Sequence, residues 1–441
     1  MAAVLTGLDR VAAGGLRLPG RGRAAVLCNN NTVSSEWIPT LYALRRIPGL
    51  EIVRILSPQH GFASEKQDNM IESADAKHPD LGVPITSLYS HRRSPDPELF
   101  EDTDVVLIDL QDVGTRVYTF VSTAFLTIQG AYSAGVPVIV LDRPNPIGGA
   151  CEGPVLEEAL TSFVGMLDVP LRHGLTMGEL CLYGAGRSKL IDEAAATGIA
   201  ERALDDSVLQ DTDSSYLRIV GATGWSRRLM HGMSELPWVP PSPNMPSLET
   251  ALVYPGQVAL EGTNLSEGRG TTRPFETFGA PFLRPPAVLE TLVEIGAVKP
   301  PGGTPHGTVH GCRDGALAGA LLREITFEPT FQKFAGETVH GFQLHVLEPE
   351  RFHPVHAVVA LLWAVRRAHP ENFRWCQPPY EYETVRLPID LIFGTDKTRK
   401  AIDDGTHPDK IASGWASGIV AFKERVRSAI VYRDTPREVR R

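Results

Sequence analysis

The chain has 441 residues, more than one hydrophobic core usually supports, so we expect two domains. Its formal net charge is −9 and it has no block of lysine and arginine, which argues against a nucleic-acid partner and against an anionic membrane surface. Five widely spaced cysteines without a C-x-x-C pair, no apolar run of bilayer length and no secretory signal predict a cytoplasmic protein, and nothing calls for a metal or another cofactor.

The first third of the chain alternates short apolar runs with helix-sized segments. The runs are rich in Val, Ile and Leu, and they cover 24–28, 51–57, 84–89, 104–110 and 136–142. Helical patterns cover 36–46 and 117–134. Continuous apolar strands separated by helices are typical of a parallel sheet covered on both faces. We therefore predict a doubly wound α/β domain.

The middle of the chain ends in a proline cluster, WVPPSPNMP, at 238–246. Such a cluster favours a boundary or a crossing between lobes, so we divide the chain into domains at 1–246 and 247–441. Beyond the boundary, helical patterns and strand patterns mix without regular alternation. The helices are expected at 247–253, 287–296 and 354–368, and the strands at 321–331 and 341–347. This mixture predicts an α+β second domain.

Polar residues follow the predicted strands, where parallel sheets gather functional groups. These residues lie at 29–31, 59–61, 109–116 and 142–145. The dinucleotide fingerprint, the phosphate-binding loop, the G-x-S-x-G nucleophile motif and the H-E-x-x-H zinc motif are all absent. What remains is a site built from carboxylates, amides and arginines.

One run in the second domain, EGTNLSEGRGTTRPFE at 261–276, mixes acids and arginines with glycine and hydroxyl side chains. Apolar sequence flanks it on both sides, so an ordered binding loop is favoured over a linker. Paired carboxylates serve glycoside hydrolysis, and they also hold divalent metals. Arginines among them favour the first reading, because a guanidinium repels a cation and can grip an anionic substrate group. The candidate arginines are Arg116, Arg143, Arg269 and Arg273.

Ordered motifs along the chain make a specific resemblance. SPQHGF, DLQDVGTRVYTF, LDRPNPIGG, PLRHGLTMGEL, PSPNMP and the 261–276 run resemble the exo-β-N-acetylmuramidase family, long catalogued as a bacterial domain of unknown function. The resemblance implies a Rossmann-like domain followed by a smaller α+β auxiliary domain, with the active site in the cleft between them. It also implies release of terminal non-reducing N-acetylmuramic acid from peptidoglycan fragments, in cell-wall recycling. The expected partner is a small amino-sugar or muropeptide substrate.

The polar positions and the resemblance together suggest site residues. The catalytic candidates are Gln59, His60, Glu65, Asp112 and Tyr118, and the substrate-binding candidates are Arg116, Asp142, Arg143, Asn145, Asn264, Glu267, Arg269 and Arg273. We expect Arg269 or Arg273 to pair with the lactyl carboxylate of muramic acid, while Asn264 and Glu267 hold sugar hydroxyls.

The sequence departs from the family at one position. Relatives commonly have glutamate, a leading candidate for the catalytic acid, where this chain has Gln59, and an amide cannot serve as a carboxylic acid. Either Glu65, Glu72 or Asp112 replaces it, or Gln59 and His60 hold a water. A non-catalytic or altered-specificity amino-sugar-binding protein on the same scaffold is the alternative function, and a metal-dependent hydrolase is the third.

Overall fold

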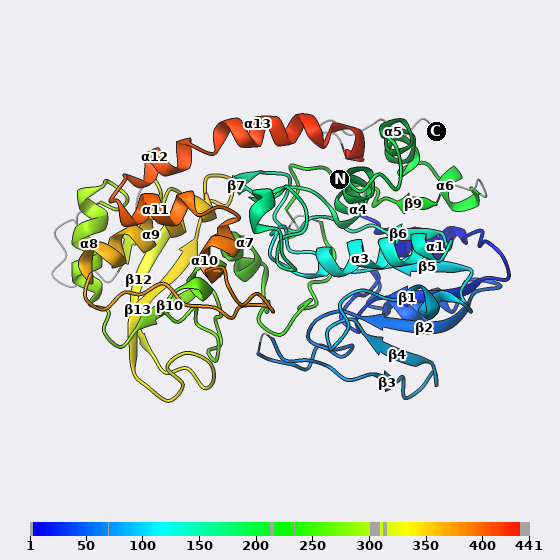
Figure 1. Cartoon of the computed structure of the whole chain (residues 1–441), viewed down its shortest axis with the longest axis horizontal. Helices are drawn as coiled ribbons and strands as arrows, with labels where there is room; N and C mark the ends of the chain where they lie inside the picture. The colour runs from blue at the N-terminus through cyan, green and yellow to red at the C-terminus, as the bar shows by residue number, and fades with distance from the viewer. Residues whose placement is uncertain are drawn as a thin grey trace.

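A computed structural model describes residues 3–68, 70–211, 216–230, 232, 234–299, 309–311 and 315–432 of the chain. Two lobes lie side by side along its longest axis, the first in blue to green and the second in green to orange (Figure 1).

The first lobe is built on a sheet that, among the described residues, has the strand order β3-β4-β2-β1-β5-β6-β9. Six strands are parallel, and β3 (Ala76–Lys77) is antiparallel at the edge. The parallel strands are β1 (Arg23–Leu27), β2 (Glu51–Ser57), β4 (Pro84–Ser87), β5 (Val105–Ile108), β6 (Val138–Leu141) and β9 (Leu217–Val220). This order confirms the doubly wound, Rossmann-like prediction. From β1 the successive strands β2 and β4 are added on one side, and β5, β6 and β9 on the other. The strand order therefore reverses between β1 and β5, and such sheets bind ligands beside this point.

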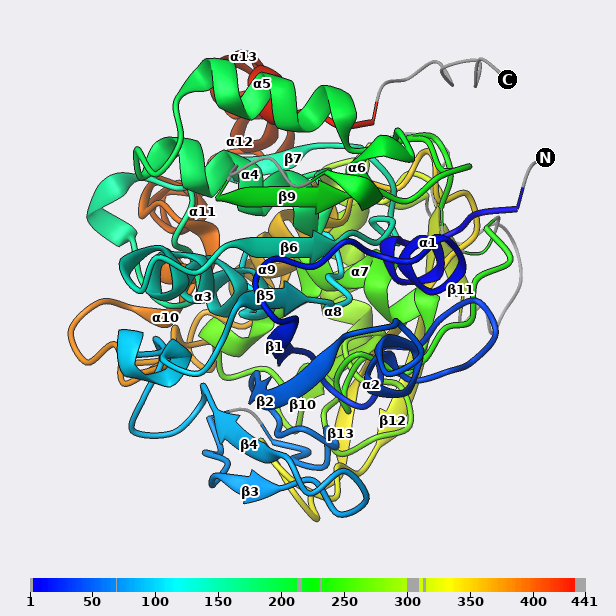
Figure 2. The ribbon, with the colours of Figure 1, turned by 90° about the vertical axis from the view of Figure 1, so that its right-hand side faces the viewer.

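Helices cover both faces of this sheet (Figure 2). Ala24 and Val26 of β1 belong to one apolar cluster with α1 (Gly7–Gly14) and α2 (Thr40–Leu44). The intervening side chains belong to the larger core with α3 (Phe120–Ser133), α4 (Met177–Arg187) and α5 (Glu193–Arg202). Two buried faces explain why the strands read as continuous apolar runs. The helix predicted over 36–46 is shorter, because Pro39 disfavours helical backbone in the residue before it.

The second lobe has an antiparallel sheet, in the order β10-β13-β12-β11 among the described residues. Its strands are β10 (Thr277–Ala280), β11 (Val309–Gly311), β12 (Ala320–Phe327) and β13 (Val339–Val346). The helices α7 (Leu248–Gln257), α8 (Pro285–Glu294) and α9 (Pro354–Ala368) pack together beside it. The α+β prediction is confirmed, and the helix expected at 354–368 has the predicted bounds.

The last described segment of the chain returns to the first lobe. After α10 (Pro388–Phe393) and α11 (Lys397–Asp403), the helices α12 (Pro408–Ser413) and α13 (Ala416–Arg425) run along the top of Figure 1 toward that lobe. There the Tyr432 hydroxyl donates to Asp142 at 2.8 Å. The last described residues of the predicted second domain, 427–432, thus pack on the first lobe, because polar groups buried there take hydrogen bonds from this segment.

Two short strands and one short helix complete the first lobe: β7 (Glu152–Val155), β8 (Pro170–Arg172) and α6 (Ser207–Gln210). None of the helices in the described residues combines the length and the apolarity that a membrane crossing needs.

Candidate active site

A pocket with a cavity volume of about 40 Å³ lies where the two lobes meet. Loops after β2 and β5 form one wall, the proline-rich crossing forms another, and three segments of the second lobe close it. Its polar lining consists of Gln59, His60, Tyr118, Thr119, Ser242, Asn244, Tyr254, Glu261, Arg269, Tyr380 and Glu381. Of the predicted site residues, the fold brings Gln59, His60, Tyr118 and Arg269 together here.

Gln59 and His60 follow the carboxyl end of β2. The Thr119 hydroxyl donates to Gln59 Oε1 at 2.5 Å, so the Gln59 amide nitrogen points the other way and donates to Glu381 Oε1 at 3.2 Å. His60 Nδ1 lies 2.7 Å from the Lys66 carbonyl oxygen, which can only accept, so the proton is on Nδ1 and Nε2 is an acceptor. Burial lowers the pKa of His60 to about 4, and the Arg269 charge adds to this. His60 is therefore neutral near pH 7.

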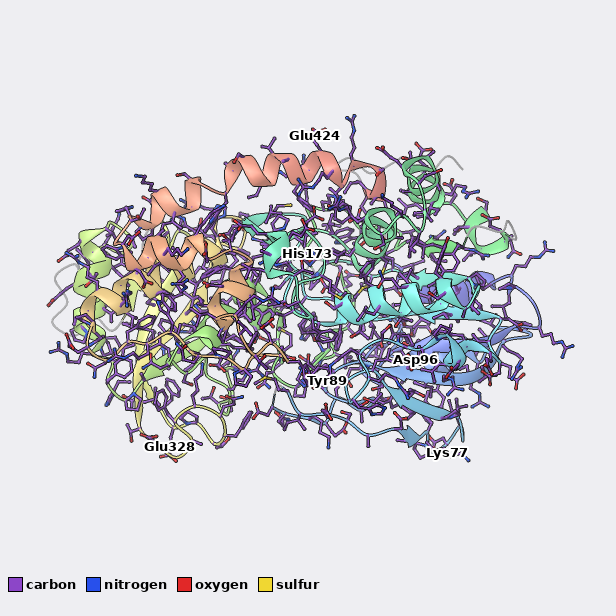
Figure 3. The ribbon with its side chains drawn as sticks, viewed as in Figure 1. Lys77, Tyr89, Asp96, His173, Glu328 and Glu424 are labelled. Atoms are coloured by element: carbon purple, nitrogen blue, oxygen red, sulfur yellow. The ribbon has the colours of Figure 1, made fainter. Side chains whose placement is uncertain are left out.

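Glu381 is a pocket residue that the sequence did not indicate. It lies in a loop of the second lobe, and its carboxyl group accepts from the Tyr89 hydroxyl at 2.5 Å and from the Gln59 amide at 3.2 Å. Tyr89 itself lies where the lobes meet (Figure 3). Burial raises the pKa of Glu381, and the charge of Glu261 raises it further, whereas the two hydrogen bonds lower it. Burial is the largest of these effects, so this carboxyl group holds a proton more readily than an exposed one.

Glu261 is the second carboxyl group in the pocket, and its surroundings differ. Arg269 Nη2 donates to it at 2.7 Å, and the Tyr380 hydroxyl donates to its other oxygen at 2.7 Å. Arg269 Nε also lies 3.4 Å from Glu267. Arg269 Nη1 is buried and has no hydrogen-bond partner among the described residues. Arg269 Nε also lacks a hydrogen-bond partner among these residues, so the guanidinium offers unused donors to an anionic group that enters the pocket.

The other predicted residues of the 261–276 run lie outside this pocket. Glu267 is buried and pairs with Lys333 Nζ at 3.0 Å. Asn264 donates to the Asn372 carbonyl and accepts from the Arg374 amide, so its side chain fastens two loops together. Arg273 is half-exposed and pairs with Glu276. Of the two arginines expected to meet the lactyl group, only Arg269 reaches the pocket.

Arg116 and Arg143, two of the predicted substrate-binding residues, hold the fold together and do not line this pocket. Arg116 donates to the carbonyls of Pro154, Val169 and Ile392 at 2.8–2.9 Å. Arg143 makes a two-pronged ion pair with Asp109, at 2.5 and 2.9 Å, and donates to the Val33 carbonyl. Both guanidinium groups are buried, and of their nitrogens Arg116 Nε lacks a hydrogen-bond partner among the described residues. Their hydrogen bonds join elements of the fold.

Asp142 and Asn145, also predicted to bind substrate, likewise lie outside this pocket. The Asp142 carboxylate accepts from Thr176, Gly178 and Tyr432 at 2.7–2.8 Å. Asn145 donates to the Leu175 carbonyl and accepts from the Ile147 amide. Both side chains hold the helix α4 region against the sheet.

Asp112, Glu65 and Glu72 do not line the pocket, although each was a candidate to replace the acid missing at position 59. Asp112 is buried, accepts from the Gly114 amide at 2.6 Å and lies 3.2 Å from His173 Nε2. Glu65 and Glu72 are exposed. The carboxyl group that the pocket places beside Gln59 comes from the other lobe.

A Rossmann-like lobe and an α+β lobe that enclose a pocket with two carboxyl groups define a two-domain α/β protein of a kind suited to glycosides. Residues 24–249 match the N-terminal domain of exo-β-N-acetylmuramidase NamZ, and residues 252–432 match its C-terminal domain. The chain belongs to this family.

Known relatives agree with this assignment. The chain is 31% identical over 413 residues to the peptidoglycan β-N-acetylmuramidase NamZ of Bacillus subtilis (strain 168), covering 93% of this chain and 87% of that protein. Two crystal structures of DUF1343 family proteins from Bacteroides fragilis NCTC 9343 share the fold, at 23% and 24% identity and TM-scores of 0.77 and 0.65. Each comparison covers 98% of this chain and 100% of the other.

Proposed function

We propose that this protein is an exo-β-N-acetylmuramidase that hydrolyses terminal non-reducing N-acetylmuramic acid from peptidoglycan fragments. The supporting observation is the interlobe pocket, in which one carboxyl group is paired with arginine and the other accepts only from uncharged donors. Glycosidases need two carboxyl groups in different protonation states, and unlike surroundings provide this. Membership of the family and the activity named for the Bacillus relative support the same reaction.

Arg269 provides a reason for muramic acid in particular. This sugar carries a lactyl carboxylate that N-acetylglucosamine lacks, and Arg269 Nη1 is a buried donor without a partner among the described residues. Nη2 donates to Glu261, whereas Nε lies 3.4 Å from Glu267 and has no hydrogen-bond partner among the described residues either. An incoming carboxylate would complete the hydrogen bonding of the guanidinium, and a charge-assisted bond in a buried site is among the stronger polar contacts.

The test compares 4-nitrophenyl N-acetyl-β-muramide with the corresponding glucosaminide. Arg269→Ala should lower kcat/KM for the muramide about 10- to 100-fold more than for the glucosaminide, because one charged hydrogen bond contributes about 1.5–3 kcal/mol. Arg269→Lys keeps the charge near Glu261. Its loss on the muramide should also exceed its loss on the glucosaminide, but by a smaller factor. Arg273→Ala, in the same loop but outside the pocket, is the control and should leave the ratio unchanged. Equal losses on both substrates would reject the lactyl contact.

The alternatives predict different outcomes in the same assay. A sugar-binding protein that has lost hydrolysis, which Gln59 favours, would bind N-acetylmuramic acid and turn over neither substrate. A metal-dependent hydrolase would lose its turnover in EDTA. The proposed glycosidase keeps its turnover in EDTA.

We also propose a cytoplasmic location. Cys28, Cys151, Cys181 and Cys376 are free thiols, as expected in a reducing compartment, whereas Cys312 lies outside the described residues. Fractionation of the source cells tests this, and recovery of the protein outside the cytoplasmic fraction would contradict it.

A further inference from the structure

We propose that Glu381, from the second lobe, is the proton donor of this enzyme and supplies the acid that Gln59 does not. The inference rests on the proposed function and adds a catalytic residue to it.

The position of Glu381 in the pocket suits a proton donor. Glu381 lines the interlobe pocket, and its Oε1 lies 3.2 Å from the Gln59 amide nitrogen. The Thr119 hydroxyl fixes the orientation of that amide, so Gln59 presents a donor and not an acceptor to the carboxyl group. Glu381 therefore lies one hydrogen bond from Gln59, whose amide cannot itself supply a proton as a carboxylic acid does. Gln59 acts on it as a positioning residue.

The surroundings of the Glu381 carboxyl group allow it to carry a proton. Its two hydrogen-bond partners, Tyr89 and Gln59, are uncharged donors, so no ion pair fixes it as a carboxylate. Each carboxyl oxygen has a further lone pair, which leaves room for a proton directed into the pocket. Burial favours the protonated form by raising the pKa of Glu381. Glu261, by contrast, is ion-paired with Arg269 and is unsuited to donate a proton.

The charged groups around Glu381 are limited in number. Across the pocket, the charge of Glu261 favours its proton, and Arg269 opposes it as the weakest of the effects. From the first lobe, the guanidinium of Arg93 lies 3.4 Å over the ring of Tyr382 and is paired with Glu72. The net balance leaves burial as the deciding influence on this carboxyl group.

The backbone conformation at Glu381 is unusual. Glu381 has φ 44° and Tyr382 has φ 70°, the left-handed region that L residues seldom adopt. Two consecutive residues of this kind cost energy, and such conformations are concentrated at functional sites. Here the conformation accompanies a buried Glu381 side chain and an exposed Tyr382. His60 and Phe275, which also line the pocket, share the left-handed conformation, with φ values of 72° and 63°.

The chemical step follows from these contacts. Glu381 transfers its proton to the glycosidic oxygen, and the bond between that oxygen and C1 of the sugar breaks with its electron pair remaining on the leaving oxygen. Overall, water supplies a hydroxyl group to C1, and the remaining proton of that water restores Glu381 through the solvent. No oxidant, metal or further reactant is needed for the balance.

Glu381→Gln tests the assignment through its dependence on the leaving group. The substrates are 2,4-dinitrophenyl N-acetyl-β-muramide, whose leaving group needs no protonation, and the disaccharide of N-acetylmuramic acid and N-acetylglucosamine, whose leaving group does. The variant should lose about 100-fold or more in kcat on the disaccharide and less than about tenfold on the dinitrophenyl substrate. Glu383→Gln, in the same loop but outside the pocket, is the matched control and should show no such split.

The pH dependence gives a second readout. The donor must be protonated, so kcat/KM of the wild type on the disaccharide falls as pH rises through the pKa of Glu381, and this fall should be absent in Glu381→Gln. In Tyr89→Phe the fall should move to higher pH, because the lost hydrogen bond had lowered that pKa.

The results of these experiments distinguish a failure of this inference from a failure of the proposed function. No turnover of the dinitrophenyl muramide by the wild type would overturn the proposed function and the inference with it. Wild-type turnover with equal losses on both substrates in Glu381→Gln would overturn the inference alone. The leaving-group split in Glu65→Gln instead would assign the proton to Glu65. If Glu381→Gln does not fold, Tyr89→Phe decides, since an unmoved pH profile contradicts the role of Glu381.

Discussion

Arg116 and Arg269 are both buried, yet their surroundings give them opposite uses. Each nitrogen at the end of Arg116 donates to main-chain carbonyls, whereas Arg269 Nη1 has no partner among the described residues. Both were predicted to bind substrate, because a polar residue in a loop can either contact a ligand or form hydrogen bonds with neighbouring protein groups. Local sequence does not distinguish these two fates, which depend on contacts made by distant segments.

Replacing Arg116 tests its structural role. Arg116→Met should lower the free energy of unfolding by at least about 3 kcal/mol, because three buried carbonyls lose their donors. Urea denaturation measures this. Arg367→Met is the control, since its ion pair with Glu294 is mostly exposed and should contribute less than about 1 kcal/mol. Equal stability of wild type and Arg116→Met would contradict the assigned role.

At the scale of elements, the first turn of α9 is held by the other lobe. The Glu152 carboxylate of β7 accepts from the His356 amide at 2.7 Å, at the N-terminus of the helix. The strands and α9 were predictable because their apolar periodicity is local. This contact was not, because the two residues are 204 positions apart.

Glu152 makes stability depend on pH. Burial raises its pKa from 4.5 to about 7, outweighing Arg172 and the helix amides, so the folded protein binds this proton more tightly than the unfolded chain does. Its contribution to stability is therefore full below about pH 4.5 and is lost as pH rises to about 7. The difference in unfolding free energy between wild type and Glu152→Gln should fall over this window by up to about 3 kcal/mol.

Urea titrations at several pH values measure that difference, and Glu98→Gln, at an exposed position, provides the control. A pH-independent difference between wild type and Glu152→Gln would contradict the buried, proton-binding state of Glu152.

At the scale of the whole molecule, the candidate site exists only because the lobes are closed on each other. Gln59 and Glu381 are 322 positions apart and come from different lobes, and Arg116 ties the first lobe to α10 nearby. Sequence motifs could indicate Gln59, His60, Tyr118 and Arg269, because these lie at strand ends or in a conspicuous polar loop. They could not indicate Glu381, because its loop follows no strand of the parallel sheet. Glu381 reaches Gln59 only because the two lobes pack against each other.

The most direct measurement is a crystal structure of Glu381→Gln with a disaccharide that has N-acetylmuramic acid at its non-reducing end. We predict that the muramic acid ring lies between His60 and Arg269, with its lactyl carboxylate on Arg269 Nη1 and the glycosidic oxygen within hydrogen-bonding distance of the side chain at position 381. A sugar bound outside the space between the lobes, or one whose glycosidic oxygen faces away from position 381, would contradict the account.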